Sequence, residues 1–390
     1  MTGDFVQLRA DWNYPTSVRF GAGRVAELPD AVRAAGIARP LFVTDPNLAR
    51  LPMAAEALSL LRGAGISAAL FSEVRPNPVE ANIAAGVAAF RTGAHDGVVA
   101  FGGGSALDAG KLIAFMNAQS RPVWDFEDRA DWWTRANAQG IAPIVAVPTT
   151  AGTGSEVGRA AVVTEEATRT KKIIFHPGMM PKVVICDPAL TVGMPPLITA
   201  GTGMDALAHC LEAYCAPSYH PLADGIAAEG VRLVGENLPR AVGNGNDLEA
   251  RAHMMAAAAM GATAFQKGLG AIHALSHPVG ALYDTHHGLT NGVFMPYVLV
   301  FNRTAVEPRI KRLAAYIGLR PSFRAFLDWV LALRAEIGVP HTLAGLNVDA
   351  EHVDRIVAMA VEDPTAGGNP RPFDKRAART VFKRAVEGRV

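Results

Sequence analysis

The first half of the chain alternates short runs rich in β-branched and aromatic residues with alanine-rich stretches, and this pattern limits the possible folds most strongly. Strands that alternate with helices along a sequence are typical of βαβ units, whose strands lie parallel in one sheet. The runs that predict strands are residues 40–44, 97–101, 144–147 and 183–186. Each run ends in a polar or glycine-rich turn, and ligands of such sheets bind outside the carboxyl ends of the strands. We therefore expect binding residues in these turns.

The second half of the chain predicts helices. From the two prolines at 195 and 196 onward, the pattern consists of long helical segments such as 221–237 and 248–266, without a further convincing strand. A chain of 390 residues also exceeds the size at which a single core usually stops growing. We expect an α/β domain with a parallel sheet at residues 1–194 and a helical domain at residues 195–390.

Composition excludes several classes of protein. The formal net charge is +1, so there is no excess of basic residues of the kind that binds nucleic acid or anionic membranes. No apolar stretch predicts a membrane span, and residues 1–10 lack the apolar core of a signal peptide. The three cysteines form no C-x-x-C pair, which argues against a cysteine-built zinc site and suits a reducing compartment. We expect a cytoplasmic protein that binds neither nucleic acid nor membranes.

Two glycine-rich turns predict a nucleotide site in the first half. Residues 102–105 (GGGS) follow the strand at 97–101 and precede a helical stretch, and residues 148–156 (PTTAGTGSE) follow the strand at 144–147. Glycines between a strand and a helix let backbone N–H groups approach a pyrophosphate at the positive end of the helix. The second turn adds hydroxyl groups and amides beside the first. The alternative interpretation is that such turns are only tight connections.

A competing phosphate site is residues 21–26 (GAGRVA), which match the dinucleotide fingerprint G-x-G-x-x-G/A. The run before it is short and contains Arg19, so we prefer the triple glycine for the pyrophosphate. In either case Asp45 follows the strand at 40–44, where a carboxylate can accept hydrogen bonds from a ribose and repel a 2′-phosphate. Asp45 therefore favours NAD over NADP, unless it serves only the turn before Pro46.

The second half contains residue types that bind metals, at helical spacing. Asp205 and His209 are four residues apart in a stretch that predicts a helix, so both side chains leave the same face. His273 and His277 repeat this spacing, and two more histidines follow within ten residues of His277. A single histidine in an apolar helix usually belongs to the core or the surface, but clustered rings need polar partners, which a metal supplies to several at once. A carboxylate with several imidazoles suits Fe²⁺ or Zn²⁺ better than Ca²⁺ or Mg²⁺. Spacing alone admits either His273 or His277 as a ligand.

Together these motifs resemble those of the iron-containing alcohol dehydrogenase family, in the group that contains lactaldehyde reductase and the butanol dehydrogenases. The likeness extends over nearly the whole chain. It rests on residues 102–105 with Asp108 and Lys111, and then, in the expected order, on residues 148–156, 203–214 and 268–292. The resemblance implies a doubly wound, dinucleotide-binding α/β domain followed by an all-helical metal-binding domain.

The resemblance also implies roles for individual residues. The implied metal ligands are Asp205, His209, His273 and His287. His277 resembles a histidine that binds no metal and lies beside the nicotinamide and the substrate. The implied NAD contacts are Asp45, Gly102, Gly103, Gly104, Ser105, Asp108, Thr149, Thr150, Thr153 and Lys171.

Two segments depart from the family's pattern. His286 stands where many relatives have proline before the last ligand, and residues 366–370 (AGGNP) replace the more usual Thr-Asn-Pro ending. Both departures allow a place near the substrate, and the alternative for His286 is a solvated loop residue. They leave the ligand set intact but make the particular alcohol unpredictable.

These features predict a metal-dependent, NAD-linked oxidoreductase that interconverts an alcohol and its aldehyde or ketone by hydride transfer. The metal, Fe²⁺ or alternatively Zn²⁺, would act as a Lewis acid on the substrate oxygen, and His277 would relay the proton. The resemblance implies a homodimer or larger homo-oligomer.

Three alternatives remain. A lyase resembling dehydroquinate synthase would need a basic pocket, and no dense Arg/Lys cluster lies near the motifs. A metal-dependent hydrolase would leave the glycine turns unexplained. A non-catalytic protein is disfavoured by the intact ligand set.

Overall fold

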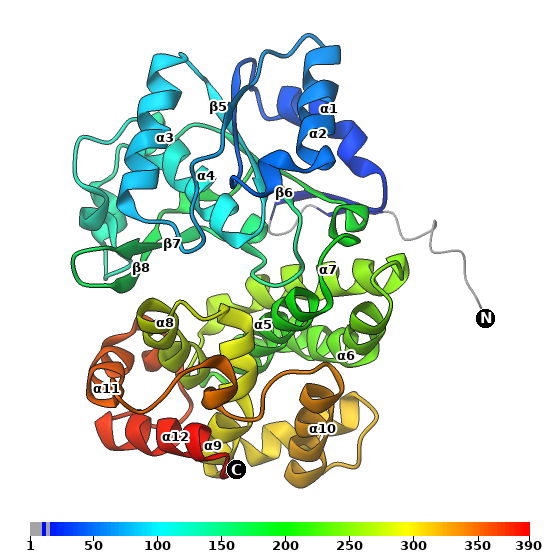
Figure 1. Cartoon of the computed structure of the whole chain (residues 1–390), viewed down its shortest axis with the longest axis vertical. Coiled ribbons are helices and arrows are strands. Elements are labelled where there is room, and N and C mark those ends of the chain that lie inside the picture. The colour runs from blue at the N-terminus through cyan, green and yellow to red at the C-terminus, as the bar shows by residue number, and fades with distance from the viewer. Residues whose placement is uncertain (1–9, 13–15) are drawn as a thin grey trace. The chain divides into compact units, whose positions relative to one another are not determined.

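The structure, a computed structural model, describes residues 10–12 and 16–390. Residues 1–9, which belong to the segment where the sequence predicts no signal peptide, lie outside these ranges. The chain divides into two compact units (Figure 1): Met1–Thr150 with Gly154–Val192, and Ala151–Thr153 with Gly193–Val390. The predicted domain boundary after residue 194 stays a prediction. None of the described helices is long and apolar enough to span a membrane.

The first unit contains a seven-stranded sheet, and six of its strands run parallel, which confirms the predicted fold class. The strand order is β1-β2-β9-β6-β5-β3-β4, with β1 antiparallel to β2. The four predicted runs form β3, β5, β6 and β9. The strands of this sheet are β1 Ala10–Trp12, β2 Ser17–Phe20, β3 Pro40–Val43, β4 Ala69–Phe71, β5 Gly97–Gly102, β6 Ile144–Pro148 and β9 Val183–Cys186. A separate antiparallel hairpin consists of β7 Ala160–Glu165 and β8 Thr170–Phe175.

Helices cover both faces of this sheet, which explains why β3, β5, β6 and β9 are buried along their whole length. Val99 and Phe101 of β5 share a core with α1 (Leu28–Ala34) and α2 (Pro52–Gly63). Ala100 points to the opposite face, where a Cβ at Gly110 of α4 (Gly104–Met116) would lie 2.6 Å from its Cβ. α3 (Glu80–Thr92) packs on α4 (Figure 1). The sheet is therefore wound on both sides.

The second unit is built from helices: α6, α7 and α9 pack around α5, and the remaining helices pack mainly on α8 and α9 (Figure 1). The predicted helical segments 221–237 and 248–266 correspond to α6 and α7. The helices are α5 Pro196–Cys215, α6 Pro221–Gly243, α7 Leu248–Ala264, α8 Ala271–Tyr283, α9 His287–Tyr316, α10 Phe323–Glu336, α11 Val353–Glu362 and α12 Lys375–Glu387. α5 is buried on almost every side because α6, α7 and α9 surround it.

A glycine at position 288 lets α5 and α9 approach each other closely. A Cβ at Gly288, in the first turn of α9, would overlap the carbonyl oxygen of Gly201 on α5 and would lie 3.0 Å from the Cβ of Asp205. Because that carbonyl belongs to the backbone of a buried helix, it cannot move aside as a flexible side chain would. Glycine at 288 therefore fixes how near the start of α9 lies to α5.

We expect Gly288→Ala to lower the melting temperature, because the added methyl group forces the two helices apart, and overpacking of this kind costs about 1–3 kcal/mol. The matched control is Gly225→Ala on α6, where a Cβ would meet nothing within 4 Å. Alanine in an open helical position stabilises by about 0.5–1 kcal/mol. Calorimetry should therefore show opposite shifts for the two variants. A melting temperature for Gly288→Ala at or above that of the wild type would contradict the close packing.

Candidate functional site

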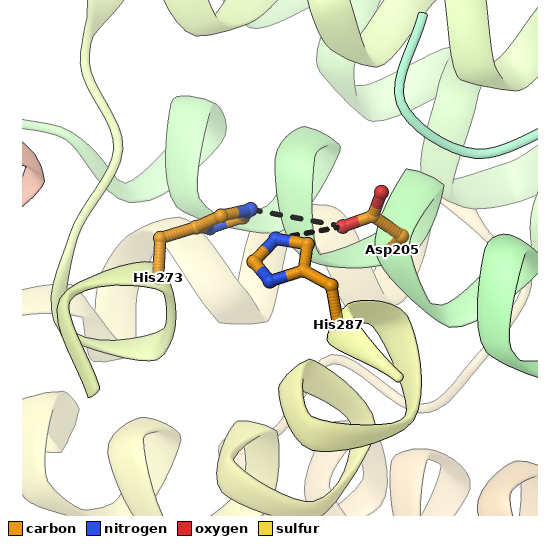
Figure 2. Close-up of side chains that lie close together, drawn as sticks. All are labelled: Asp205, His273 and His287. Carbon is orange, nitrogen blue, oxygen red and sulfur yellow. Dashed lines mark ion pairs between the residues drawn. The ribbon is translucent and has the colours of Figure 1, made fainter. Parts of the chain in front are cut away.

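Three side chains from three helices of the second unit converge on one point. Asp205 belongs to α5, His273 to α8, and His287 is the first residue of α9 (Figure 2). One ligand atom from each lies within 4.8 Å of the other two. The Asp205 Oδ1 atom is 3.8 Å from the Nε2 atom of His273 and 3.6 Å from that of His287. These distances leave room for an ion between the three atoms.

His209 lies beside this group. It follows Asp205 by one turn of α5, and its Nε2 atom is 3.9 Å from the Asp205 Oδ1 atom. Its ring stacks on that of His273, with 4.7 Å between centroids and 14° between planes. The three mutually close ligand atoms do not include one from His209. The structure thus brings the four predicted ligands together, with His209 at the edge of the group.

Burial and neighbouring charges shift the pKa values of the group in different directions. Burial would raise the pKa of Asp205, but the neighbouring imidazoles lower it well below its usual range. Burial lowers the pKa of His209 to about 4, although Asp205 opposes this shift. Burial would also lower the pKa of His273, but hydrogen bonds to carboxylates raise it to about 9. Near pH 7, Asp205 is therefore ionised and His209 neutral, the states in which these side chains bind metals, whereas His273 carries a proton that a bound metal would displace.

Asn291, which sequence reasoning missed, lies at the centre of this group, and its contacts indicate whether the group suits a cation. Its Nδ2 atom lies 2.8 Å from Asp205 Oδ1, 3.3 Å from His273 Nε2 and 3.2 Å from His287 Nε2. A carboxylate oxygen and two ring nitrogens thus face one amide donor, while the buried Oδ1 atom of Asn291 has no hydrogen-bond partner among the described residues. Acceptors that converge in this way, one carboxylate oxygen with imidazole nitrogens, match the ligands of a divalent ion such as Fe²⁺ or Zn²⁺. The i, i+4 spacing from His287 was the signal that could have revealed Asn291.

His277 is held next to the group by a carboxylate that the sequence did not reveal. Its Nδ1 atom is 2.7 Å from the Oδ2 atom of Asp363, and its ring stacks on that of His287 with centroids 5.3 Å apart. Burial would raise the pKa of Asp363, but the neighbouring His277 ring and its hydrogen bond lower it, so Asp363 accepts the hydrogen bond. Asp363 is 86 residues from His277 in the chain, and no local pattern links them.

The two segments that depart from the family's pattern lie at helix ends. The Nδ1 atom of His286 accepts a hydrogen bond from the Leu289 amide, so His286 caps the N-terminus of α9. Residues 366–368 belong to a short 3₁₀ helix, Pro364–Gly368. Asn369 after it accepts a hydrogen bond from the Ala271 amide, at the start of α8. A structural role is therefore visible for both segments, and a place near the substrate stays a prediction.

In the first unit, the start of the second glycine-rich turn lies beside the first turn. β5 and β6 are neighbours, and the Thr149 amide donates a hydrogen bond to the Gly102 carbonyl over 3.0 Å. Gly102 has a φ of +146°, which favours glycine, and Gly103 caps the N-terminus of α4. A Cβ at Gly103 would lie 3.3 Å from the side chain of Thr150. Gly103, Gly104 and Ser105 are only half-buried, so the positive end of α4 is accessible.

The competing turn at residues 21–26 uses its amides internally. The amides of Gly23 and Val25 donate hydrogen bonds to the two carboxylate oxygens of Asp187, over 3.0 and 2.9 Å. Asp187 is fully buried after β9. A phosphate would have to displace this carboxylate, so the turn is a poor phosphate site.

The other predicted nucleotide contacts are placed as follows. Asp45 Oδ1 accepts hydrogen bonds from the amides of Asn47 and Leu48, each over 2.9 Å, so the proposed turn role of Asp45 is present. Asp108 accepts hydrogen bonds from Ser155 and from the Val162 amide, and holds β7.

The two remaining predicted nucleotide contacts, Lys171 and Thr153, belong to other parts of the structure. Lys171 belongs to β8, and its neighbour Lys172 forms an ion pair with Glu165 over 3.0 Å. Adjacent residues of a strand leave opposite faces, so Lys171 does not share that pairing surface. Thr153 belongs to the second unit. Whether these residues contact a nucleotide stays a prediction.

Comparison with known proteins identifies the family. Residues 15–188 match the family described as iron-containing alcohol dehydrogenase, and residues 199–386 match the Fe-containing alcohol dehydrogenase family, C-terminal. The 4-hydroxybutyrate dehydrogenase of Cupriavidus necator is 37% identical over 385 residues, which cover 96% of this chain and 98% of that protein. The NAD-dependent methanol dehydrogenase of Bacillus methanolicus is 34% identical over 380 residues, which cover 95% of this chain and 98% of that protein.

A solved structure agrees with these sequence matches. The crystal structure of a 1,3-propanediol oxidoreductase matches this one with a TM-score of 0.89 at 34% identity, and the match covers 94% of this chain and 97% of that chain. The resemblance that the motifs indicate is thereby confirmed. The chain belongs to the iron-containing alcohol dehydrogenase family and is an oxidoreductase of that family.

Proposed function

We propose that this enzyme transfers a hydride reversibly between an alcohol and NAD, with one divalent metal ion held by Asp205, His209, His273 and His287. The observation that carries the proposal is the convergence of ligand atoms from Asp205, His273 and His287 within 4.8 Å in a chain of this family. We propose Fe²⁺ as the ion, with Zn²⁺ as the alternative that the same ligands accept.

The accessible N-terminus of α4 supports the nucleotide part of the proposal. The half-buried glycines there leave the positive helix end accessible to a pyrophosphate. Thr149 and Thr150 add hydroxyl groups from the neighbouring turn. The proposed contacts are Gly102, Gly103, Gly104, Ser105, Thr149 and Thr150, with Asp45, Asp108, Thr153 and Lys171 as further residues.

The metal and the cofactor supply the chemistry that amino-acid side chains lack: a Lewis acid for the substrate oxygen and an acceptor for the hydride. His277 then handles the proton. Because Asp363 accepts a hydrogen bond from its Nδ1–H group, the Nε2 atom of His277 carries the free lone pair and can take the proton of the substrate hydroxyl. Asp363 also fixes the ring beside that of His287.

We further propose that the enzyme acts on a small-molecule alcohol or aldehyde, works as a homodimer or larger homo-oligomer, and resides in the cytoplasm. The three free, buried cysteines, Cys186, Cys210 and Cys215, support a reducing compartment. The 4-hydroxybutyrate and methanol specificities of two relatives differ from each other, so they do not name the substrate.

We expect NAD to exceed NADP in kcat/KM when iron-loaded or zinc-loaded enzyme is tested on primary alcohols, diols and hydroxy acids. Asp45→Asn should raise the relative kcat/KM for NADP about tenfold, or about 1.4 kcal/mol, because the charge that opposes a 2′-phosphate is lost. Asparagine keeps an acceptor for the Asn47 and Leu48 amides, so the turn itself should survive. A wild-type enzyme that prefers NADP would overturn the role of Asp45. Failure to form NADH with every alcohol tested would overturn the proposed function.

We expect removal of a metal ligand to abolish bound metal and activity together. His273→Ala and His287→Ala should each retain almost no metal after loading and desalting, because the remaining ligands bind weakly. His277→Ala is the matched control: another histidine of α8 whose loss should leave the metal in place while lowering kcat. Elemental analysis of the three purified variants measures this directly. Metal missing from His277→Ala, or a full complement in His287→Ala, would show that the ligands are wrongly assigned.

A further inference from the structure

Glu212 is a buried carboxylate that the proposed mechanism does not use. It lies on α5 at 5% exposure, seven residues after Asp205 and three after His209, so all three side chains leave one face of the helix. Within the described residues, Glu212 forms an ion pair with His273 and with no lysine or arginine. Burying a carboxylate without partners costs several kcal/mol, so the groups that face it must account for its presence.

Both oxygens of Glu212 contact the start of α8. The Oε1 atom accepts a hydrogen bond from the Ile272 amide over 2.6 Å. The Oε2 atom lies 2.6 Å from the Nδ1 atom of His273. A carboxylate oxygen accepts this hydrogen bond, so Nδ1 carries a proton. When His273 gives up its other proton to bind a metal, the nitrogen left free is Nε2, which faces Asp205.

Helix capping alone does not account for this arrangement. One oxygen is enough to cap the Ile272 amide, and Asn369 already accepts a hydrogen bond from the Ala271 amide beside it. A Cβ at Gly270 would lie 3.0 Å from oxygens of both Glu212 and Asn369, so glycine there lets the two acceptors approach together. The second oxygen of Glu212 remains for His273.

We propose that Glu212 is a positioning residue: it binds no metal, but fixes the ring orientation and the Nδ1–H tautomer of His273. The inference rests on the proposed function, because it takes His273 as a metal ligand through Nε2. A carboxylate that accepts from the far nitrogen of a ligating imidazole orients the ring and makes the ligand more basic. Glu212 therefore tightens metal binding without touching the ion.

The test compares the dissociation constants of Zn²⁺ from wild type, Glu212→Gln and Asn369→Ala by competition with a chromophoric chelator. Glu212→Gln should weaken binding about 10- to 100-fold. Glutamine has one acceptor oxygen, so it cannot serve both the Ile272 amide and the His273 ring. Asn369→Ala removes the neighbouring cap and should leave the Zn²⁺ affinity within a few-fold of wild type.

The outcomes separate the two proposals. Suppose that wild type binds one Zn²⁺. If Glu212→Gln binds it equally tightly, or if Asn369→Ala loses as much affinity as Glu212→Gln, the role of Glu212 is overturned and the proposed function still stands. Wild type that binds no Zn²⁺ overturns both. If Glu212→Gln does not fold, as judged by circular dichroism, ¹⁵N-histidine NMR of the metal-free wild type, titrated to the pH at which the His273 ring is neutral, decides: a ring protonated at Nδ1 supports the proposal, and one protonated at Nε2 refutes it.

Discussion

Two buried carboxylates on one helix of the second unit need polar partners, and the neighbouring helices are placed so that they supply them. Asp205 and Glu212 of α5 are both almost inaccessible to water, and each would be costly there without partners. Their partners come from α8 and α9: imidazoles and the Asn291 amide for Asp205, and the first turn of α8 for Glu212. The polar contacts and the glycine contact at Gly288 therefore require the same placement of these helices, so packing and site geometry reinforce each other.

In the first unit, the decisive question is which backbone amides remain available. The turn at residues 21–26 matches a dinucleotide fingerprint, yet a carboxylate of the same unit, Asp187, already occupies its amides. The turn after β5 leaves the end of α4 half-exposed instead. A sequence motif records where glycines stand but not what their amides bind, and only the structure distinguishes the two turns.

Sequence patterns predicted the strands that are buried on both faces and missed the strands that are not. β3, β5, β6 and β9 are continuous apolar runs, whereas β2 contains Arg19, which pairs with Glu27, and β8 contains two lysines. Helical spacing placed Asp205 with His209, and the family resemblance separated His273 from His277. Glu212 and Asp363 could not be predicted, because their histidines lie 61 and 86 residues away in the chain. His286, for which a loop or substrate role was considered, caps α9.

The central claim is that one metal ion lies among Asp205, His209, His273 and His287. Anomalous diffraction from crystals of the iron-loaded and the zinc-loaded enzyme, collected at the absorption edge of each metal, tests it most directly. The account predicts one strong peak per chain, bonded to an oxygen of Asp205 and to three imidazole nitrogens, with His277, Asn291 and Glu212 outside the coordination sphere. A peak elsewhere in the chain, or one bonded to His277 in place of any of the three histidines, would contradict it.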